Sequence, residues 1–245
     1  MGLWVASTAS RYAHRSHRAV LVTWLRRAWL AVVTATLGCL ALSCGEPALL
    51  GPSKLPFYSS AEFTAEWPTA AQGRERPPHQ IAAFSLINHL DQTVTQQTLR
   101  GHIYVANFFF AHCQSICPKM AVSFRTIQAA FHDDPQVLLV SHSVEPSMDT
   151  PESLREYAAK NQVTAGKWHL LTGEQAVIYR LARSSYFAEK TQGMQRKADE
   201  FLHTENMLLI DALGRIRGIY NATLPAEAER VVQDIQALKG ELRLR

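Results

Sequence analysis

The chain has 245 residues and a formal net charge of +4 at pH 7. Its first 45 residues hold five of the 25 basic residues and none of the 21 acidic ones, so the remainder carries 20 − 21 = −1. A surface that tracks phosphates needs clustered Lys and Arg, so this balance argues against a nucleic-acid partner, and the remaining length of about 200 residues fits one domain plus a tether.

Residues 1–44 are typical of an export leader. A basic stretch is followed by Ala28–Leu42, which is uncharged and short for a membrane-spanning helix. The stretch ends in Ala41-Leu42-Ser43-Cys44-Gly45, which resembles a bacterial lipoprotein cleavage box, so we expect Cys44 to carry a lipid anchor. The alternative is an uncleaved single-span anchor in which Cys39 and Cys44 are ordinary helix residues. Both predict a protein of the bacterial cell envelope, anchored to the membrane, with its domain facing the periplasm or the exterior.

Residues 45–80 contain six prolines and few periodic apolar positions, which indicates a tether, although its aromatic residues suggest that part of it packs on the domain. Residues 81–240 alternate between apolar runs and amphipathic stretches. The predicted strands are Ile81–Ile87, Ile103–Phe110, Val137–Val144, Trp168–Leu171, Met207–Ile210 and Ile216–Tyr220, and the predicted helices are Ser115–Phe131, Pro151–Lys160, Glu174–Ala182 and Pro225–Leu238. This order predicts an α/β, thioredoxin-like fold with a central mixed sheet flanked by helices, joined to an N-terminal membrane tether.

Cys113 and Cys117 are the only cysteines outside the leader. They follow a strand predicted to be buried on both faces, at the turn into a helix. Residues four apart on a helix share one face, so the two sulfurs could form a disulfide or bind one metal ion. The partial positive charge of a helix N-terminus favours the thiolate, which is the form that binds metal and attacks disulfides.

Three interpretations of this thiol pair stay open at this point. A structural disulfide is common in exported proteins, but a bridge over one helical turn closes a small loop and constrains the unfolded chain little. Redox exchange is possible, although the spacing has one residue more than Cys-x-x-Cys. Metal binding is the third interpretation, because two thiolates joined by an imidazole suit copper.

Four segments in order resemble the SCO/SenC family, whose members are membrane-tethered, thioredoxin-like proteins that deliver copper to respiratory cytochrome oxidase. The resemblance spans about residues 81–238. It is carried by the segments Phe108-Phe-Phe-Ala-His-Cys-Gln-Ser-Ile-Cys-Pro-Lys-Met120, Ser143-Val-Glu-Pro-Ser-Met-Asp-Thr-Pro-Glu152, Trp168-His-Leu-Leu-Thr-Gly173 and Leu202-His-Thr-Glu-Asn-Met-Leu-Leu-Ile-Asp211.

The resemblance implies that Cys113, Cys117 and His203 bind copper. His112 is a rival third ligand, but a side chain adjacent to Cys113 should point elsewhere. The chain departs from the family pattern at Gln114, where Pro is usual, and at Glu145, where Asp is usual. We assign Asp149 and Glu152 to capping of the helix that starts at Pro151, together with Thr150.

The resemblance therefore implies a copper metallochaperone that serves the copper-site subunit of a cytochrome oxidase, reduced by a thioredoxin-like partner. The alternative is a thiol–disulfide oxidoreductase in which Cys113 and Cys117 are the redox-active pair and keep the copper-site cysteines of a partner reduced. A peroxide-reducing protein is less well supported, because no activating Arg or Thr lies close to Cys113 in the sequence.

Overall fold

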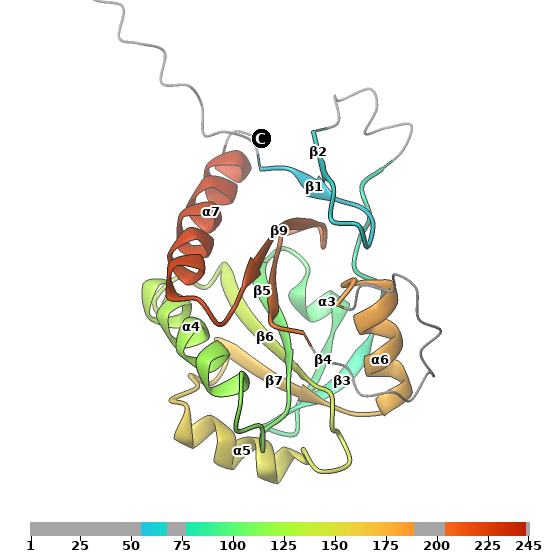
Figure 1. Cartoon of the computed structure of the whole chain (residues 1–245), viewed down its shortest axis with the longest axis vertical. Helices are drawn as coiled ribbons and strands as arrows, with labels where there is room; N and C mark the ends of the chain where they lie inside the picture. Colours follow the sequence, from blue (N-terminus) through green and yellow to red (C-terminus); the bar gives the residue numbers. More distant parts are fainter. Residues whose placement is uncertain (1–54, 68–76, 189–203, 244–245) are drawn as a thin grey trace, which may run out of the picture. The chain divides into compact units, whose positions relative to one another are not determined.

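A computed structural model describes residues 55–67, 77–188 and 204–243. Within these ranges, seven strands form one sheet in the order β4-β3-β7-β6-β5-β8-β9. Figure 1 shows the sheet at the centre of the domain, with helices on both of its faces. The strands are β3 (Ser85–Asn88), β4 (Thr93–Thr95), β5 (Ile103–Phe109), β6 (Val137–Ser143), β7 (Trp168–Thr172), β8 (Asn206–Ile210) and β9 (Ile216–Asn221).

The sheet is mixed, as predicted. β5, β6 and β7 are parallel neighbours, whereas β8, β9, β3 and β4 join them antiparallel. All residues of β5 and β6 are buried, because helices cover both faces of these central strands. Short hairpins close each edge, and in the β8–β9 turn Gly214 has φ +78 and donates its amide to the carbonyl of Asp211 at 2.8 Å.

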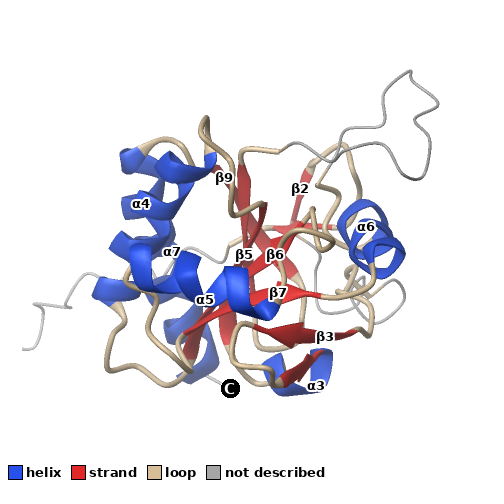
Figure 2. Ribbon diagram, turned by 90° about the horizontal axis from the view of Figure 1, so that it is seen from below, coloured by secondary structure: helices blue, strands red, loops and turns tan. Residues whose placement is uncertain are grey.

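Five helices are described. They are α3 (Gln96–Leu99), α4 (Cys117–Ala130), α5 (Pro151–Lys160), α6 (Gln175–Ser184) and α7 (Pro225–Arg243). Apolar residues of α4, α5 and α7 pack on one face of the sheet around Phe124 and Trp168, and α3 and α6 cover the other face around Tyr104 and Tyr186. Figure 2 shows α4 and α7 on the side of the sheet opposite α6.

The helix after β5 begins two residues later than predicted, at Cys117 rather than Ser115. A start at Ser115 would place Pro118 in the fourth helical position, where its missing N–H would cost a backbone hydrogen bond. With Ile116 as N-cap, Pro118 falls in the first turn, where no amide donor is needed. Cys113 therefore lies in the preceding turn and not on the helix, which corrects the helical face assumed for the pair.

The sequence interpretation missed some small elements. The predicted strand Ile81–Ile87 is shorter, since β3 begins at Ser85, and Ile81 bonds instead to the carbonyl of Gly214. β4 and α3 were not predicted. Two further short strands, β1 (Phe57–Tyr58) and β2 (Ala65–Glu66), pair with each other within the segment interpreted as a tether.

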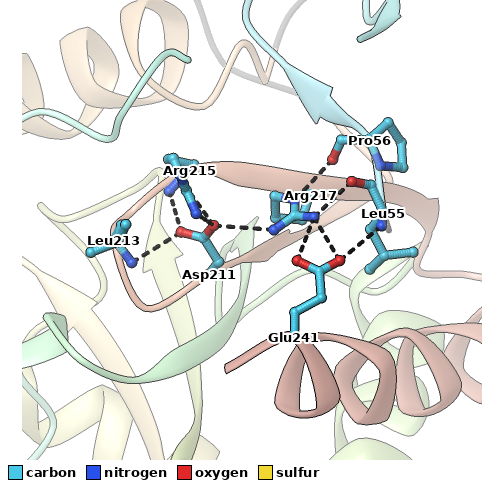
Figure 3. Close-up of polar contacts among 7 residues, drawn as sticks. All are labelled: Leu55, Pro56, Asp211, Leu213, Arg215, Arg217 and Glu241. Atoms are coloured by element: carbon cyan, nitrogen blue, oxygen red, sulfur yellow. Dashed lines mark hydrogen bonds and ion pairs between the residues drawn. The ribbon is translucent and has the colours of Figure 1, made fainter. Parts of the chain in front are cut away.

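The segment at Leu55–Phe57 is fixed to the domain by a buried ionic cluster, drawn in Figure 3. The guanidinium of Arg217, on β9, is 2% exposed and donates to the carbonyls of Leu55 and Pro56 at 2.6 and 2.9 Å. It also pairs with both oxygens of Glu241 at 3.1 Å and with Asp211 at 3.4 Å. The Phe57 ring lies over the guanidinium, 4.2 Å from centroid to carbon. We call this cluster, made by Asp211, Arg217 and Glu241, the clamp.

The clamp and the thiol pair lie at opposite ends of the sheet. β5 and β8 pair antiparallel, with Tyr104 opposite Ile210 and Asn107 opposite Met207. Asp211 therefore follows β8 at the end where β5 begins, whereas residues 110–116 follow β5 at its other end. Among the described residues, no helix is long and apolar enough to cross a membrane.

Candidate metal centre

The two cysteines lie at the loop between β5 and α4. A turn brings the amide of Cys113 to the carbonyl of Phe110 at 3.3 Å, and Cys117 opens α4. Cys113 is partly exposed and Cys117 is 4% exposed, and both are free thiols in this structure. The Cys117 thiol hydrogen-bonds to the sulfur of Cys113, so the turn brings the two sulfurs together without a shared helical face.

The two thiols differ in their proton affinity. Partial burial raises the pKa of Cys113, but hydrogen bonds from the Cys117 thiol and from the amides of Ser115, Ile116 and Cys117 outweigh it and bring the pKa below its usual value. Burial raises the pKa of Cys117 to about 12. Cys113 is therefore the more accessible and the more acidic of the two thiols, and Cys117 holds its proton more tightly.

Tyr157, on α5, flanks the thiol pair, although the sequence reasoning did not single it out. Its ring lies against that of Phe109, with centroids 5.0 Å apart, and both cysteines contact the same apolar cluster. Burial raises the pKa of Tyr157, so its hydroxyl stays neutral. The apolar spacing along α5 predicts that one face of this helix is buried, but it does not predict what that face meets.

Asp149 ties the loop to the rest of the fold. Its side chain is fully buried, accepts a hydrogen bond from the Ser143 hydroxyl at 2.6 Å, and accepts from the amide of Ala111 at 3.1 and 3.3 Å. The expectation that Asp149 caps α5 is wrong, because the hydroxyl of Thr150 takes that role by accepting from the amide of Ser153. Glu152 lies in the first turn of α5, as expected.

The rival ligand His112 is exposed, and its Nδ1 lies 3.8 Å from an oxygen of Asp149. Glu145 is partly buried at the end of β6, where its amide donates to the Ser143 hydroxyl at 3.1 Å. Within the described ranges, no three His, Cys, Asp or Glu side chains are placed to hold one metal ion.

His203, the expected third ligand, and Cys44, the expected lipid anchor, lie outside the described residues. Description resumes at Thr204, two residues before β8 begins at Asn206. Because Met207 pairs with Asn107 near the end of β5, this point of the chain lies at the same end of the sheet as the cysteine loop.

A mixed α/β sheet with a close thiol pair at a strand-to-helix turn defines a thioredoxin-like thiol protein, and the two soft sulfur donors suit a soft metal ion. The SCO1/SenC family model matches residues 72–240, and the chain belongs to this family.

Known relatives agree with this assignment. A SCO1 protein homolog of Bacillus subtilis is 26% identical over 163 residues, which are 65% of this chain and 82% of that protein. A Stutzerimonas stutzeri protein named for copper binding is 28% identical over 162 residues, which are 63% of this chain and 76% of that protein. The crystal structure of a SCO1/SenC family lipoprotein from Bacillus anthracis matches with a TM-score of 0.58 at 26% identity and covers 67% of this chain and 98% of its own.

Proposed function

We propose that this protein is a membrane-tethered copper metallochaperone that holds copper through Cys113, Cys117 and His203 and passes it to the copper-site subunit of a cytochrome oxidase. The observation that carries the proposal is the pair of adjacent free thiols, one partly exposed and one buried, at the strand-to-helix turn of a SCO1/SenC protein. The name of the Stutzerimonas relative supports copper as the ion. The oxidase as recipient rests on the family resemblance.

Copper transfer suits such a site because few ligands surround the ion. Two thiolates and one imidazole leave room for an incoming ligand from the recipient, so copper can move by stepwise ligand exchange. Oxidation of Cys113 and Cys117 to a disulfide removes two protons and two electrons together with both sulfur ligands, so binding depends on redox state. A thioredoxin-like reductant would restore the dithiol.

We further propose that residues 1–44 form the leader or anchor, residues 45–80 the tether, and residues 81–240 the copper-binding domain, in the bacterial cell envelope. The Bacillus anthracis relative is described as a lipoprotein, which supports lipidation at Cys44. Labelling with a radioactive fatty acid tests this point: Cys44→Ala should abolish incorporation and Cys39→Ala should not. Incorporation that survives Cys44→Ala would refute the lipid anchor.

The second candidate function is thiol–disulfide exchange, favoured by the unequal pKa values of the two cysteines. In this reaction the Cys113 thiolate attacks a partner disulfide and displaces one partner thiolate, which leaves a mixed disulfide. Cys117 then loses its proton and attacks the Cys113 sulfur, which releases the second partner thiolate and leaves the Cys113–Cys117 disulfide. This route needs no metal and no histidine ligand.

The variant His203→Ala separates the two functions. In the reduced, detergent-solubilised full chain, we expect it to weaken copper binding by at least about tenfold, as loss of a metal partner does, while exchange with a model disulfide largely survives. His112→Ala is the matched control, because this exposed neighbour of Cys113 should leave copper binding unchanged. Unchanged copper stoichiometry and affinity in His203→Ala would show that the proposed ligand set is wrong.

A further inference from the structure

The carboxylate of Asp149 is the link between the cysteine loop and the end of the neighbouring strand. One oxygen accepts a hydrogen bond from the Ser143 hydroxyl at 2.6 Å, and both oxygens face the amide of Ala111, at 3.1 and 3.3 Å. Ser143 in turn accepts the amide of Glu145 at 3.1 Å. The carboxylate thus connects the end of β6, the start of α5 and the loop between β5 and α4.

The charge of Asp149 is not explained by helix capping. Thr150 already caps α5, and the backbone amide of Asp149 bonds to the carbonyl of Glu145 at 2.9 Å. The basic group that faces the carboxylate is His112, at 3.8 Å, and this imidazole is 63% exposed. A buried carboxylate with hydrogen bonds but so weak a counter-charge is costly to keep, and a neutral side chain would fill the same space at lower cost.

The hydrogen bond from the Ala111 amide to Asp149 explains why a buried charge is kept at this position. Ala111 lies two residues before Cys113, as the second residue of the turn that follows β5 and closes with the Cys113 amide on the Phe110 carbonyl. A charged acceptor holds a backbone amide more strongly than a neutral one does, so Asp149 fixes the second residue of this turn. Cys117 is the first residue of α4, so the position of the Cys113 sulfur relative to it depends on how this turn is held.

We infer that Asp149 is a positioning residue for the thiol pair: it preorganises the loop so that Cys113 and Cys117 meet one copper ion in a fixed geometry. The copper part of this inference rests on the proposed function. The loop part does not, because the hydrogen bond to Ala111 exists without any metal.

Asp149→Asn tests the inference in the reduced, detergent-solubilised full chain. The amide can still accept one hydrogen bond, but it carries no charge, and its NH2 group cannot accept from Ala111 or Ser143. Two controls are matched to it. Asp211→Asn removes a buried carboxylate at the opposite end of the sheet, and Thr150→Ala removes the α5 cap next to Asp149. Both should lower stability and leave the loop in place.

The first measurement needs no copper. Amide hydrogen exchange of residues 111–117 should become at least about tenfold faster in Asp149→Asn and stay unchanged in both controls. The second measurement is copper binding by competition, where Asp149→Asn should bind about tenfold more weakly and shift the sulfur-to-copper charge-transfer band. Circular dichroism confirms that each variant is folded.

Each outcome decides one of the two proposals. A folded Asp149→Asn protein with native loop exchange, native copper affinity and a native band would overturn the positioning role. Equal loosening of the loop in Thr150→Ala would overturn it too, because the effect would then come from α5. If the native chain binds no copper, the proposed function fails, and hydrogen exchange alone decides the role of Asp149.

Discussion

Replacement of Arg217 by Met should destabilise the protein by about 3 kcal/mol, within the range for breaking a buried ion pair by removing one partner. Met keeps the apolar stem of the side chain but loses the bonds to the Leu55 and Pro56 carbonyls and to Glu241. Glu241, 13% exposed, would keep only its hydrogen bond from the Leu55 amide, at 3.1 Å. The carboxylate of Asp211 would keep most of its charge compensation, because the guanidinium of Arg215 lies 2.6 Å from it.

Urea unfolding of the detergent-solubilised full chain, followed by fluorescence, measures this loss. Glu241→Gln and the double variant complete a cycle, and we expect an interaction energy of about 1–2 kcal/mol between the two side chains. Arg230→Met is the matched control, because Arg230 is 61% exposed and pairs with Glu227, so its loss should cost less than about 1 kcal/mol. A loss below about 1 kcal/mol for Arg217→Met, or an interaction energy of zero, would show that the clamp adds no stability.

Two further changes test other parts of the fold. His142 is fully buried, and burial lowers its pKa to about 4 from the ordinary value of 6.5, so as the pH falls this histidine gains a proton in the unfolded chain before it does in the folded one. The stability that comes from keeping His142 neutral is therefore complete above about pH 6.5 and falls by about 3 kcal/mol as the pH drops to about 4. His142→Leu should flatten this part of a plot of the urea midpoint against pH, and an unchanged slope would show that His142 does not cause the loss. Thr150→Ala should cost about 1 kcal/mol in the same unfolding assay by removing the bond to the Ser153 amide, and an unchanged midpoint would mean that another group caps α5.

The strands that could be predicted from the sequence are those that are buried on both faces of the sheet, because such strands are continuous apolar runs in the sequence. β5 and β6 were found this way, and the β8–β9 hairpin was found from its turn residues. β4 and α3 were missed because residues 93–99 carry few apolar side chains. Their place is set by a tight turn in which Asp91 adopts φ +58, a conformation that sequence pattern alone does not reveal.

The site was predictable only as far as its residues are close in the chain. Cys113 and Cys117 could be identified as a site from their spacing and from the apolar strand that precedes them. The roles of Asp149 and Tyr157 depend on contacts with Ala111 and Phe109, which lie 38 and 48 positions earlier in the chain, and these contacts form only once α5 packs beside the loop. Asp149 also resembled a helix cap, because Asp before Thr-Pro is a common helix start, and only the partners of its carboxylate distinguish the two roles.

The clamp has a consequence for how the thiols could meet another protein. The backbone upstream of the domain arrives beside Arg217, at the end of the sheet where β5 begins, and the cysteines occupy the far end. The point where the described chain enters the domain therefore lies at the opposite end of the sheet from the cysteine loop, so a protein that contacts the thiols need not contact the clamp.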